Sequence, residues 1–500
     1  GPKVLAEKDQ AKMEMDIIDE QIDTVGRSLM GLTLGCARCH THKFDPISHH
    51  DYYGLAGIFQ STQTMDSYET VAKWHENTIE TPDQAEELKQ HQQRVADQEE
   101  LIAKKIADAK SKLDPAPDAA DKPDEIEKRF PDETQTELAT LREDLDRLKG
   151  ETPELPTAMG VVEGDISDTA VHLRGSHLTL GDVVPRRVPE VLALHDQPVI
   201  PADQSGRLEF ARWLTDGRHP LTARVMVNRL WRGHFGRGLV PTVDNFGLKG
   251  SPPTHPELLD WLAVRFVEEG WSIKAMHRMI VLSQTYQQSS DFDASNAERD
   301  PGNQLYWRFS VRRLEAEAIR DALLAVSGQL DRTTGGNIMQ YKNREYVFNH
   351  TSQDKSKYDS SRRSIYVPVI RNHLYDMFQL FDYTDATVLN GDRNTSTIAP
   401  QALFLMNSEM VSDLMFSMAD RLLNDDADSA QRIQRLYLEA YGRPASDAEI
   451  SDGVRFLSRF ETILRENNVD SLSSESSPER SAWQAFCQAV VSSSEFVYLR

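Results

Sequence analysis

The sequence has few cysteines, no long apolar run and no excess of positive charge. Only 3 of its 500 residues are cysteine, which excludes a disulfide-rich scaffold. No stretch of about 18 apolar residues occurs, and this excludes a membrane-spanning helix in this sequence. The 56 Lys and Arg residues against 79 Asp and Glu give a formal net charge of -23, which argues against binding to nucleic acid.

The first residues also lack the basic and then apolar layout of a signal peptide. Gly1 and Pro2 have the form of a scar left when a protease removes a tag. The missing signal therefore says nothing about export of the native protein.

The composition is that of a globular protein. Of all residues 39% are hydrophobic, 27% charged and 8% aromatic, unlike a disordered or fibrous chain. A chain of 500 residues exceeds what one hydrophobic core usually serves. We therefore expect several domains.

Hydrophobic spacing predicts a mainly α fold with a small β insertion and a protruding antiparallel helical hairpin. Residues 1–80 contain the cysteine motif, and residues 81–152 are expected to form the hairpin. Residues 153–202 read as a small β unit. Residues 203–500 are expected to be mainly helical, with a long irregular stretch at 331–397.

The hairpin is predicted from a region rich in Glu, Gln, Lys, Asp and Ala. Leu88, Val95 and Ile102 stand seven residues apart, and a second set steps by three and four residues: Leu138, Leu141, Leu145 and Leu148. Pro and Asp residues between them, at 114–124, break any continuous helix. We expect a coiled-coil arm that acts as a spacer or docking element.

Local patterns predict the remaining elements. Strands are expected at 158–162, 170–173, 188–194, 345–348 and 364–369. Helices are expected at 11–34, 51–60, 207–215, 220–235, 256–269, 273–283, 311–330, 400–423, 429–441, 447–466 and 482–493. Cys487 lies on an apolar helical face and is expected in a core.

Cys36, Cys39 and His40 form a C-x-x-C-H motif. Two thiols at this spacing can add to the vinyl groups of haem, and the adjacent imidazole can ligate the iron. Two intervening residues let both sulfurs reach one edge of the porphyrin. The motif predicts covalently attached haem c, with His40 as the proximal iron ligand.

Other uses of two nearby cysteines stay open. Zinc or iron without haem could take ligands from the motif and from His42, although ligands so close in sequence would strain a tetrahedral ion. A thioredoxin-like dithiol needs a βαβ context, which the helical surroundings do not supply. Two reduced cysteines without a role are the third alternative.

The opposite face of a haem iron needs a second ligand or an open position. Candidates near the motif are His49, His50 and Met65. Lys43 is a candidate contact for a haem propionate, unless it pairs with Asp45.

Longer segments around the motif resemble a known family. Gly31–Ile47 (GLTLGCARCHTHKFDPI) and Asp51–Phe59 (DYYGLAGIF) are similar to the end of the planctomycete-specific cytochrome-type (PSCyt) domain of unknown function. Its usual partner, the PSD domain of unknown function, is resembled by further segments: His219–Trp231, Gly236–Val240, Asp244–Gly247, His255–Leu262, Arg313–Asp321, Arg362–Ser364, Arg393–Asn394, Pro400–Leu403 and Ser494–Tyr498.

The resemblance implies that residues 1–80 are the C-terminal part of the cytochrome-type domain and that 203–500 are the partner domain. It implies an exported, multi-domain protein with a haem-type motif and an unassigned activity. A longer N-terminal half of the first domain is expected ahead of Lys3.

A second candidate site combines polar groups from two predicted helices and the loop between them. Its members are Asn228, Arg229, His234, Asp244, Asn245 and His255. They could form a pocket for an anion or sugar, or Arg229 and Asp244 could brace a helix junction. His234 and His255 are also candidate distal haem ligands. Arg362, Arg363, Arg393 and Asn394 could bind an anionic substrate or hold loops to carboxylates.

The sequence favours a haem oxidoreductase or electron-transfer protein whose partner is a redox protein or a small-molecule or carbohydrate substrate. Haem attachment requires an oxidising, export-linked compartment, so this reading and the resemblance imply a periplasmic or otherwise exported protein. The alternative is a non-haem protein: a metal-dependent hydrolase, or a binding protein for an anionic carbohydrate.

Overall fold

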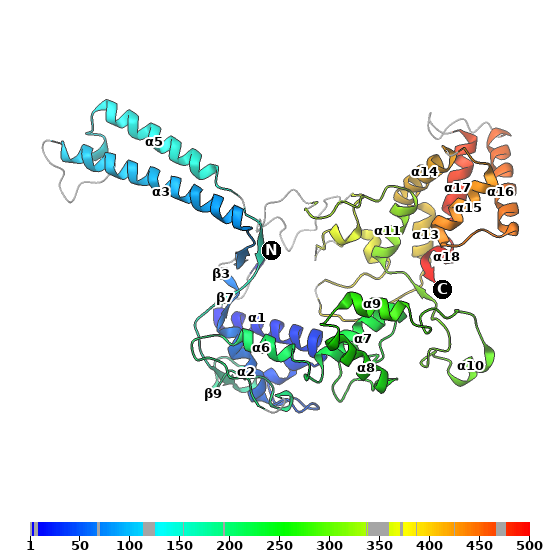
Figure 1. Cartoon of the computed structure of the whole chain (residues 1–500), viewed down its shortest axis with the longest axis horizontal. Coiled ribbons are helices and arrows are strands. Elements are labelled where there is room, and N and C mark those ends of the chain that lie inside the picture. The colour runs from blue at the N-terminus through cyan, green and yellow to red at the C-terminus, as the bar shows by residue number, and fades with distance from the viewer. Residues whose placement is uncertain are drawn as a thin grey trace. The chain divides into compact units, whose positions relative to one another are not determined.

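The computed structural model shows a mainly helical protein with short strands (Figure 1). The chain divides into two compact units, one of Gly1–Thr62 with Gly164–Arg500 and the other of Gln63–Glu163. The residues that the structure describes are 3–4, 9–67, 71–113, 126–153, 155–193, 196–336, 338, 360–370, 374–386, 388–424, 426–466 and 477–500.

The first unit begins with β1 (Lys3–Val4) and α1 (Gln10–Val25). The Asp9 side chain caps α1 by accepting from the Lys12 N–H. The helix predicted to reach residue 34 ends earlier, because a π turn (Gly26–Met30) follows and Gly31 adopts a left-handed φ of 62°. A 3₁₀ turn (Leu34–Arg38) then leads to α2 (His49–Gln60), which begins with a capping box of Ser48 and Asp51.

An antiparallel hairpin packs on α2. It consists of β8 (Thr169–His172) and β9 (Leu180–Val184), joined through a short 3₁₀ turn at Leu173–Gly175. Figure 1 shows α1, α2, α6 (Arg207–Leu214) and β9 in the same part of the molecule. Ile22, Leu55 and Trp213 belong to the hydrophobic core of this region.

The strand predicted at 188–194 is wrong. This segment contains a 3₁₀ turn at Glu190–Leu192, after Pro189. The backbone N–H and carbonyl of Val188 bond to the Gln197 side chain instead of to a strand. A side-chain amide thus replaces the ladder that a strand would need.

A second core of the first unit is formed mainly by α7 (Thr222–Phe235), α8 (Pro256–Glu268) and α9 (Ile273–Val281). It is centred on Trp231, Phe266 and Met276. The chain continues through α10 (Ala294–Arg299) and β10 (Arg312–Arg313) to α11 (Ala316–Val326).

The C-terminal helices form the third core, in which α14 (Glu409–Leu423) packs on α17 (Pro478–Val491) and Trp483 and Cys487 are buried. Cys487 therefore lies in a core, as predicted. The elements are α12 (Asp376–Leu380), α13 (Ala399–Asn407), α14 (Glu409–Leu423), α15 (Ser429–Tyr441), α16 (Asp447–Glu466), α17 (Pro478–Val491), α18 (Ser494–Val497) and β11 (Tyr498–Leu499).

Two predictions in this region need correction. The single helix predicted at 400–423 is two helices, because extended backbone at Ser408 ends α13 and begins α14. The strand predicted at 364–369 is a 3₁₀ turn at Ser364–Tyr366, because the Ser364 N–H and hydroxyl both bond to the Asp321 carboxylate. The strand predicted at 345–348 lies outside the described residues.

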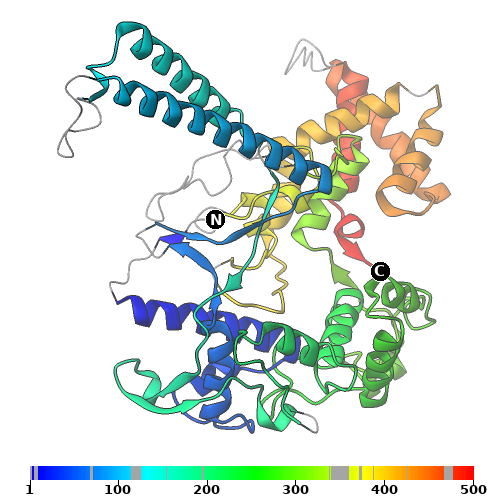
Figure 2. The same cartoon turned by 60° about the vertical axis from the view of Figure 1, so that its left-hand side comes forward.

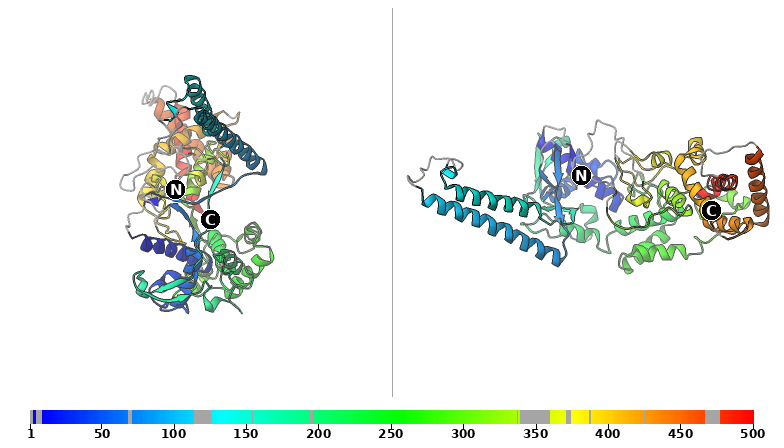
Figure 3. Two further views of the ribbon diagram at one scale, coloured as in Figure 1. Left: turned by 90° about the vertical axis from the view of Figure 1, so that its left-hand side faces the viewer. Right: turned by 90° about the horizontal axis from the view of Figure 1, so that it is seen from above.

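The second unit contains two helices and short strands. Helix α3 (Pro82–Ser111) packs on α5 (Asp132–Gly150) around Ile102, Phe130 and Leu138. Figures 2 and 3 show the two helices side by side. Gln98 donates to the Leu141 carbonyl, and Lys149 pairs with Glu99 at 2.8 Å.

The strands at the start and end of this unit are short. Strand β3 (Met65–Ser67) pairs with β4 (Val71–Trp74), and β5 (Glu76–Thr78) pairs with β6 (Thr157–Met159), both antiparallel. Strands β2 (Thr62–Gln63) and β7 (Val162–Glu163) complete the set. Within the described ranges, no helix combines the length and apolarity needed to cross a bilayer.

Candidate functional site

The C-x-x-C-H motif lies between the 3₁₀ turn Leu34–Arg38 and the start of α2. Cys36 is in the turn, Cys39 directly follows it, and His40 begins the next loop. All three side chains are exposed, and both cysteines are free thiols. The structure therefore places the two thiols and the imidazole on accessible backbone.

The motif is held by contacts from α2 to one backbone carbonyl. The Arg38 carbonyl accepts hydrogen bonds from the Tyr53 hydroxyl and from His49 Nε2, each at 2.9 Å. The Arg38 guanidinium pairs with Asp16 of α1 at 2.7 Å. Tyr53 is fully buried, and this burial raises the pKa of its hydroxyl well above the ordinary value. Arg38 therefore ties the exposed motif to both α1 and α2.

Gly175, in the β8–β9 turn, lies against the Cys39 sulfur. A Cβ atom added to Gly175 would be 2.6 Å from Cys39 Sγ, and Gly175 has a φ of 76°. Only glycine gives the turn this close approach. Two leucines of the same connection are exposed, Leu173 at 46% and Leu178 at 81%. The thiol therefore lies beside a turn that presents apolar side chains.

His40 has a defined tautomer in the structure. Its Nδ1 lies 2.7 Å from the Thr41 carbonyl oxygen. Because a carbonyl only accepts, Nδ1 must carry the proton, and Nε2 keeps its lone pair when the ring is neutral. Metal-bound histidines commonly donate the other ring N–H in this way.

His42 uses both ring nitrogens in the loop that follows. Its Nδ1 accepts from the Asp45 N–H at 2.8 Å, and its Nε2 lies 3.1 Å from the Thr33 hydroxyl. Its side chain is thus a brace for the loop, which leaves it poorly suited to the four-ligand zinc site considered above. Among the described residues, no group of three or more His, Cys, Asp or Glu side chains could hold a metal ion.

Lys43 and Asp45 have different neighbours. Lys43 Nζ lies 5.3 Å from the centre of the Phe44 ring, with Lys249 above the same ring at 4.5 Å. Asp45 is buried and accepts from the Leu248 N–H at 2.7 Å. The Asp45 carboxylate therefore contacts the loop at 247–248.

The candidate distal ligands lie in three places. His49 is beside the motif, but its Nε2 donates to the Arg38 carbonyl. His50 is exposed in the first turn of α2. Met65 is buried in β3, within the other compact unit.

Sequence reasoning missed three residues around the motif: Tyr53, His172 and Gly175. The His172 ring centre is 5.2 Å from that of Tyr53, and its buried Nδ1 has no partner among the described residues. Burial, and then the nearby Arg38 charge, lower the pKa of His172. Two histidines and a glycine in one short segment, His172, Gly175 and His177, were a signal that this segment could belong to a site. The segment is far from the C-x-x-C-H motif in sequence, so the pattern alone did not connect the two.

The second predicted site is only partly brought together. Arg229 pairs with Asp244 at 2.6 Å and also donates to the Arg27 carbonyl. Asp244 in turn accepts from the Gly391 N–H at 2.6 Å. Asn228 is fully buried, and its amide bonds to both backbone groups of Val240.

The two histidines of that set lie apart from this pair. His234 Nε2 is 2.7 Å from His277 Nδ1, and burial lowers the pKa of His234. His255 Nδ1 lies 3.0 Å from the Thr254 hydroxyl, and its ring is near Tyr306. Asn245 accepts the Gly247 N–H through its side chain and holds the loop turn.

The comparisons with known proteins identify two families of unknown function. The model of PSD1, described as a protein of unknown function (DUF1553), matches residues 206–457, half of the chain. The model of PSCyt2, described as a protein of unknown function (DUF1549), matches residues 3–64, which include the motif. No significant match came from the curated proteins or from the solved structures. The chain therefore belongs to the PSD1 family and carries a PSCyt2 segment ahead of the PSD1 region.

Proposed function

We propose that the protein carries haem c on Cys36, Cys39 and His40 and acts in electron transfer or haem-dependent oxidoreduction outside the cytoplasm. The observation that carries this proposal is the state of the motif. Two free thiols are exposed beside an imidazole whose Nδ1 donates to a carbonyl. Thioether formation needs such thiols, and iron coordination needs a basic Nε2.

The surroundings of the motif support the same proposal. Gly175 lets the β8–β9 turn approach the Cys39 sulfur closely, and the exposed Leu173 and Leu178 offer apolar surface on the same turn. A porphyrin is a large apolar group, so its burial against such side chains would be favourable. The Lys43 ammonium remains a candidate contact for a propionate. Bound haem would supply a one-electron redox centre.

The proposed candidates for the second axial ligand of the iron are His49, His50 and Met65. His49 is favoured by position, since it contacts the carbonyl of Arg38 between the two cysteines. Its Nε2 is engaged there, so only Nδ1 would be available without a rotation of the ring.

The test is an absorption spectrum combined with the intact mass of protein exported through a haem-attachment pathway. The wild type is expected to show a Soret band and a covalent mass increment that survives denaturation. A Cys36→Ala, Cys39→Ala double variant is expected to lose both. Cys487→Ala is the matched control, because this thiol is fully buried and its burial raises its pKa to about 12.

A colourless wild type that retains zinc or iron after purification would contradict the haem proposal. It would favour the alternative, a metal-dependent hydrolase or a binding protein for an anionic carbohydrate. His40→Ala adds a second readout, since it should alter the Soret band of attached haem while leaving the thioether mass in place.

We also propose that α3 and α5 form a protruding hairpin that serves as a spacer or docking arm. Their shared core is small, and charged pairs such as Lys149 with Glu99 line the contact. Replacement of residues 81–152 by a short Gly-Ser linker should leave the unfolding temperature of the rest of the protein unchanged. A large decrease in that temperature would contradict this role.

A further inference from the structure

A cavity of about 290 Å³ in the PSD1 region contains an unusual number of arginines. It lies between the C-terminal end of α7, strand β10 and residues 381–382 and 393–395. The residues that matter here are Arg232, Arg312, Arg313, Arg393, Asn394 and Thr395.

Two of these arginines already have carboxylate partners. Arg393 makes a bidentate contact with Glu317 at 2.7 and 2.8 Å. Arg232 donates to Asp392 at 2.7 Å. These side chains hold the walls of the cavity, and their charges are neutralised locally.

Arg313 is only partly satisfied. Its Nη2 donates to Asp382 at 2.6 Å, while Nε and Nη1 are buried without an acceptor among the described residues. The Asp382 carboxylate is itself occupied, because it also accepts from the N–H and hydroxyl of Ser396. The Asp382 carboxylate is therefore shared between Arg313 and Ser396.

The Arg312 side chain makes no hydrogen bond or ion pair within the described part of the chain, and its Nε is buried. Burial is the main cause that lowers its pKa, and repulsion from Arg232 adds to it, whereas the carboxylate of Glu315, which also lines the cavity, acts in the opposite direction. A half-buried guanidinium that no acceptor contacts directly costs free energy, because it loses hydration and gains no hydrogen bond. Arg312 is thus the arginine of the cavity whose guanidinium has no direct hydrogen bond or ion pair within the described chain.

We propose that this cavity binds the oxyanion group of a small polar ligand, with Arg312 as the main counter-charge. A guanidinium fork matches a carboxylate, sulfate or phosphate group in shape and charge. Asn394 and Thr395 supply neutral polar groups for the remainder of the ligand. Since small-molecule pockets start at about 300 Å³, the cavity suits a ligand the size of a sugar acid.

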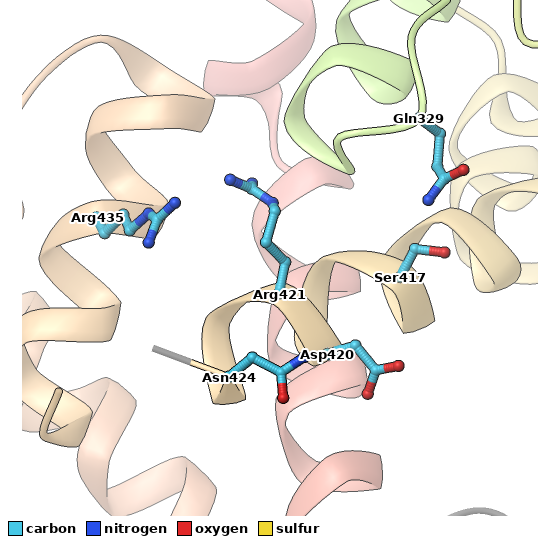
Figure 4. A pocket seen from close by; sticks show the side chains of 6 residues that line it. All are labelled: Gln329, Ser417, Asp420, Arg421, Asn424 and Arg435. Atoms are coloured by element: carbon cyan, nitrogen blue, oxygen red, sulfur yellow. The ribbon is translucent and has the colours of Figure 1, made fainter. Parts of the chain in front are cut away.

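A second arginine-lined hollow of the first unit contains no arginine that lacks a direct carboxylate partner. The cavity in Figure 4 is about 490 Å³ and is lined by Gln329, Ser417, Asp420, Arg421, Asn424 and Arg435. Both of its arginines pair with Glu439, and its Asp420 pairs with Arg480. Its cations are therefore already compensated.

The proposal is tested by calorimetric titration of the full chain with glucuronate, sulfate and phosphate, and with glucose as the neutral control. At least one of the anions is expected to bind saturably, and glucose is not. Arg312→Gln is expected to weaken that binding by about tenfold or more, because a charge-assisted contact is lost. Arg312→Lys should weaken it less, because the charge remains and only the fork is lost.

Arg308→Gln is the matched control. Arg308 is also half-buried with an Nε that lacks an acceptor among the described residues, but it stacks on Trp307 outside the cavity. The Arg308→Gln substitution should leave the affinity for the anion unchanged. No saturable binding of any of the three anions, or equal affinity in wild type and Arg312→Gln, would overturn the proposal. The inference does not depend on haem, so a colourless protein could still pass this test.

Discussion

The carboxylate of Asp45 accepts a hydrogen bond of 2.7 Å from the backbone N–H of Leu248. Asp45 belongs to the loop after the C-x-x-C-H motif, within the PSCyt2 match, whereas Leu248 lies within the PSD1 match. The Phe246 N–H adds a second bond, to the Gly31 carbonyl at 2.7 Å. Loops from the two family segments are therefore joined by direct hydrogen bonds close to the motif.

Asp45→Ala should lower the free energy of unfolding by about 1–3 kcal/mol, because the buried carboxylate and the hydrogen bond that it accepts from the Leu248 N–H are lost. Urea denaturation followed by circular dichroism measures this change. Asp182→Ala, at an exposed position of β9, is the control and should have little effect. Equal stability of both variants would show that the Asp45 contact is energetically unimportant.

Gly31→Ala and Gly233→Ala should have opposite effects. At Gly31 the φ is 62°, and an added Cβ would lie 2.7 Å from the Phe246 ring. We expect a loss of about 2 kcal/mol or more from strain and overpacking. Gly233 lies inside α7 with open space around it, so alanine should stabilise by about 0.5–1 kcal/mol. Thermal unfolding of the two variants tests both predictions. A Gly31→Ala variant as stable as the wild type would contradict the predicted strain.

The ion pair of Arg229 and Asp244 should show energetic coupling in a double-mutant cycle. Each side chain also bonds to the backbone of another segment, Arg27 and Gly391 respectively. We expect a coupling energy of about 0.5–3 kcal/mol from the unfolding of Arg229→Ala, Asp244→Ala and the double variant. Additive effects would mean that each residue acts only through its own backbone contact.

His219 should make the stability depend on pH. Its Nδ1 accepts from the Thr222 N–H and hydroxyl at the start of α7, and burial lowers its pKa to about 4. The unfolded chain then binds more protons than the native state, so the stabilisation is present above about pH 6.5 and is lost toward pH 4.

When the pH is lowered from 7 to 5, His219 should decrease the free energy of unfolding by about 2 kcal/mol. His219→Asn keeps an acceptor for the helix N-terminus and removes the titration. Urea denaturation at the two pH values should therefore show a smaller decrease for the variant. Identical decreases would place the pH dependence on other groups.

Gly175→Ala should slow the alkylation of Cys39 more than that of Cys36. The added methyl group would lie 2.6 Å from Cys39 Sγ, and no such contact involves Cys36. Iodoacetamide labelling of the haem-free protein, followed by peptide mass spectrometry, compares the two thiols within one sample. Equal slowing of both would indicate a general loss of loop structure instead.

Several features could be predicted because they depend on neighbouring residues. The mainly α fold follows from apolar steps of three and four residues, and most helix positions agree to within a few residues. Errors arise where a side chain replaces a backbone partner. The Gln197 side chain bonds to Val188, and the Asp321 carboxylate bonds to Ser364, so the strands predicted at 188–194 and 364–369 do not form. The local pattern of apolar residues does not show which distant side chain will bond to a backbone group.

The sequence by itself determined the C-x-x-C-H motif, since its five residues are adjacent and need no fold to be recognised. It also placed Cys487 in a core, through the spacing of its apolar neighbours. Only the tertiary structure decided that Gly175 lies against Cys39, that Asp45 bonds to Leu248, and that the Arg312 guanidinium lines a cavity without a direct hydrogen bond among the described residues. These contacts join segments far apart in the chain, and they exist only because whole helices and loops pack together.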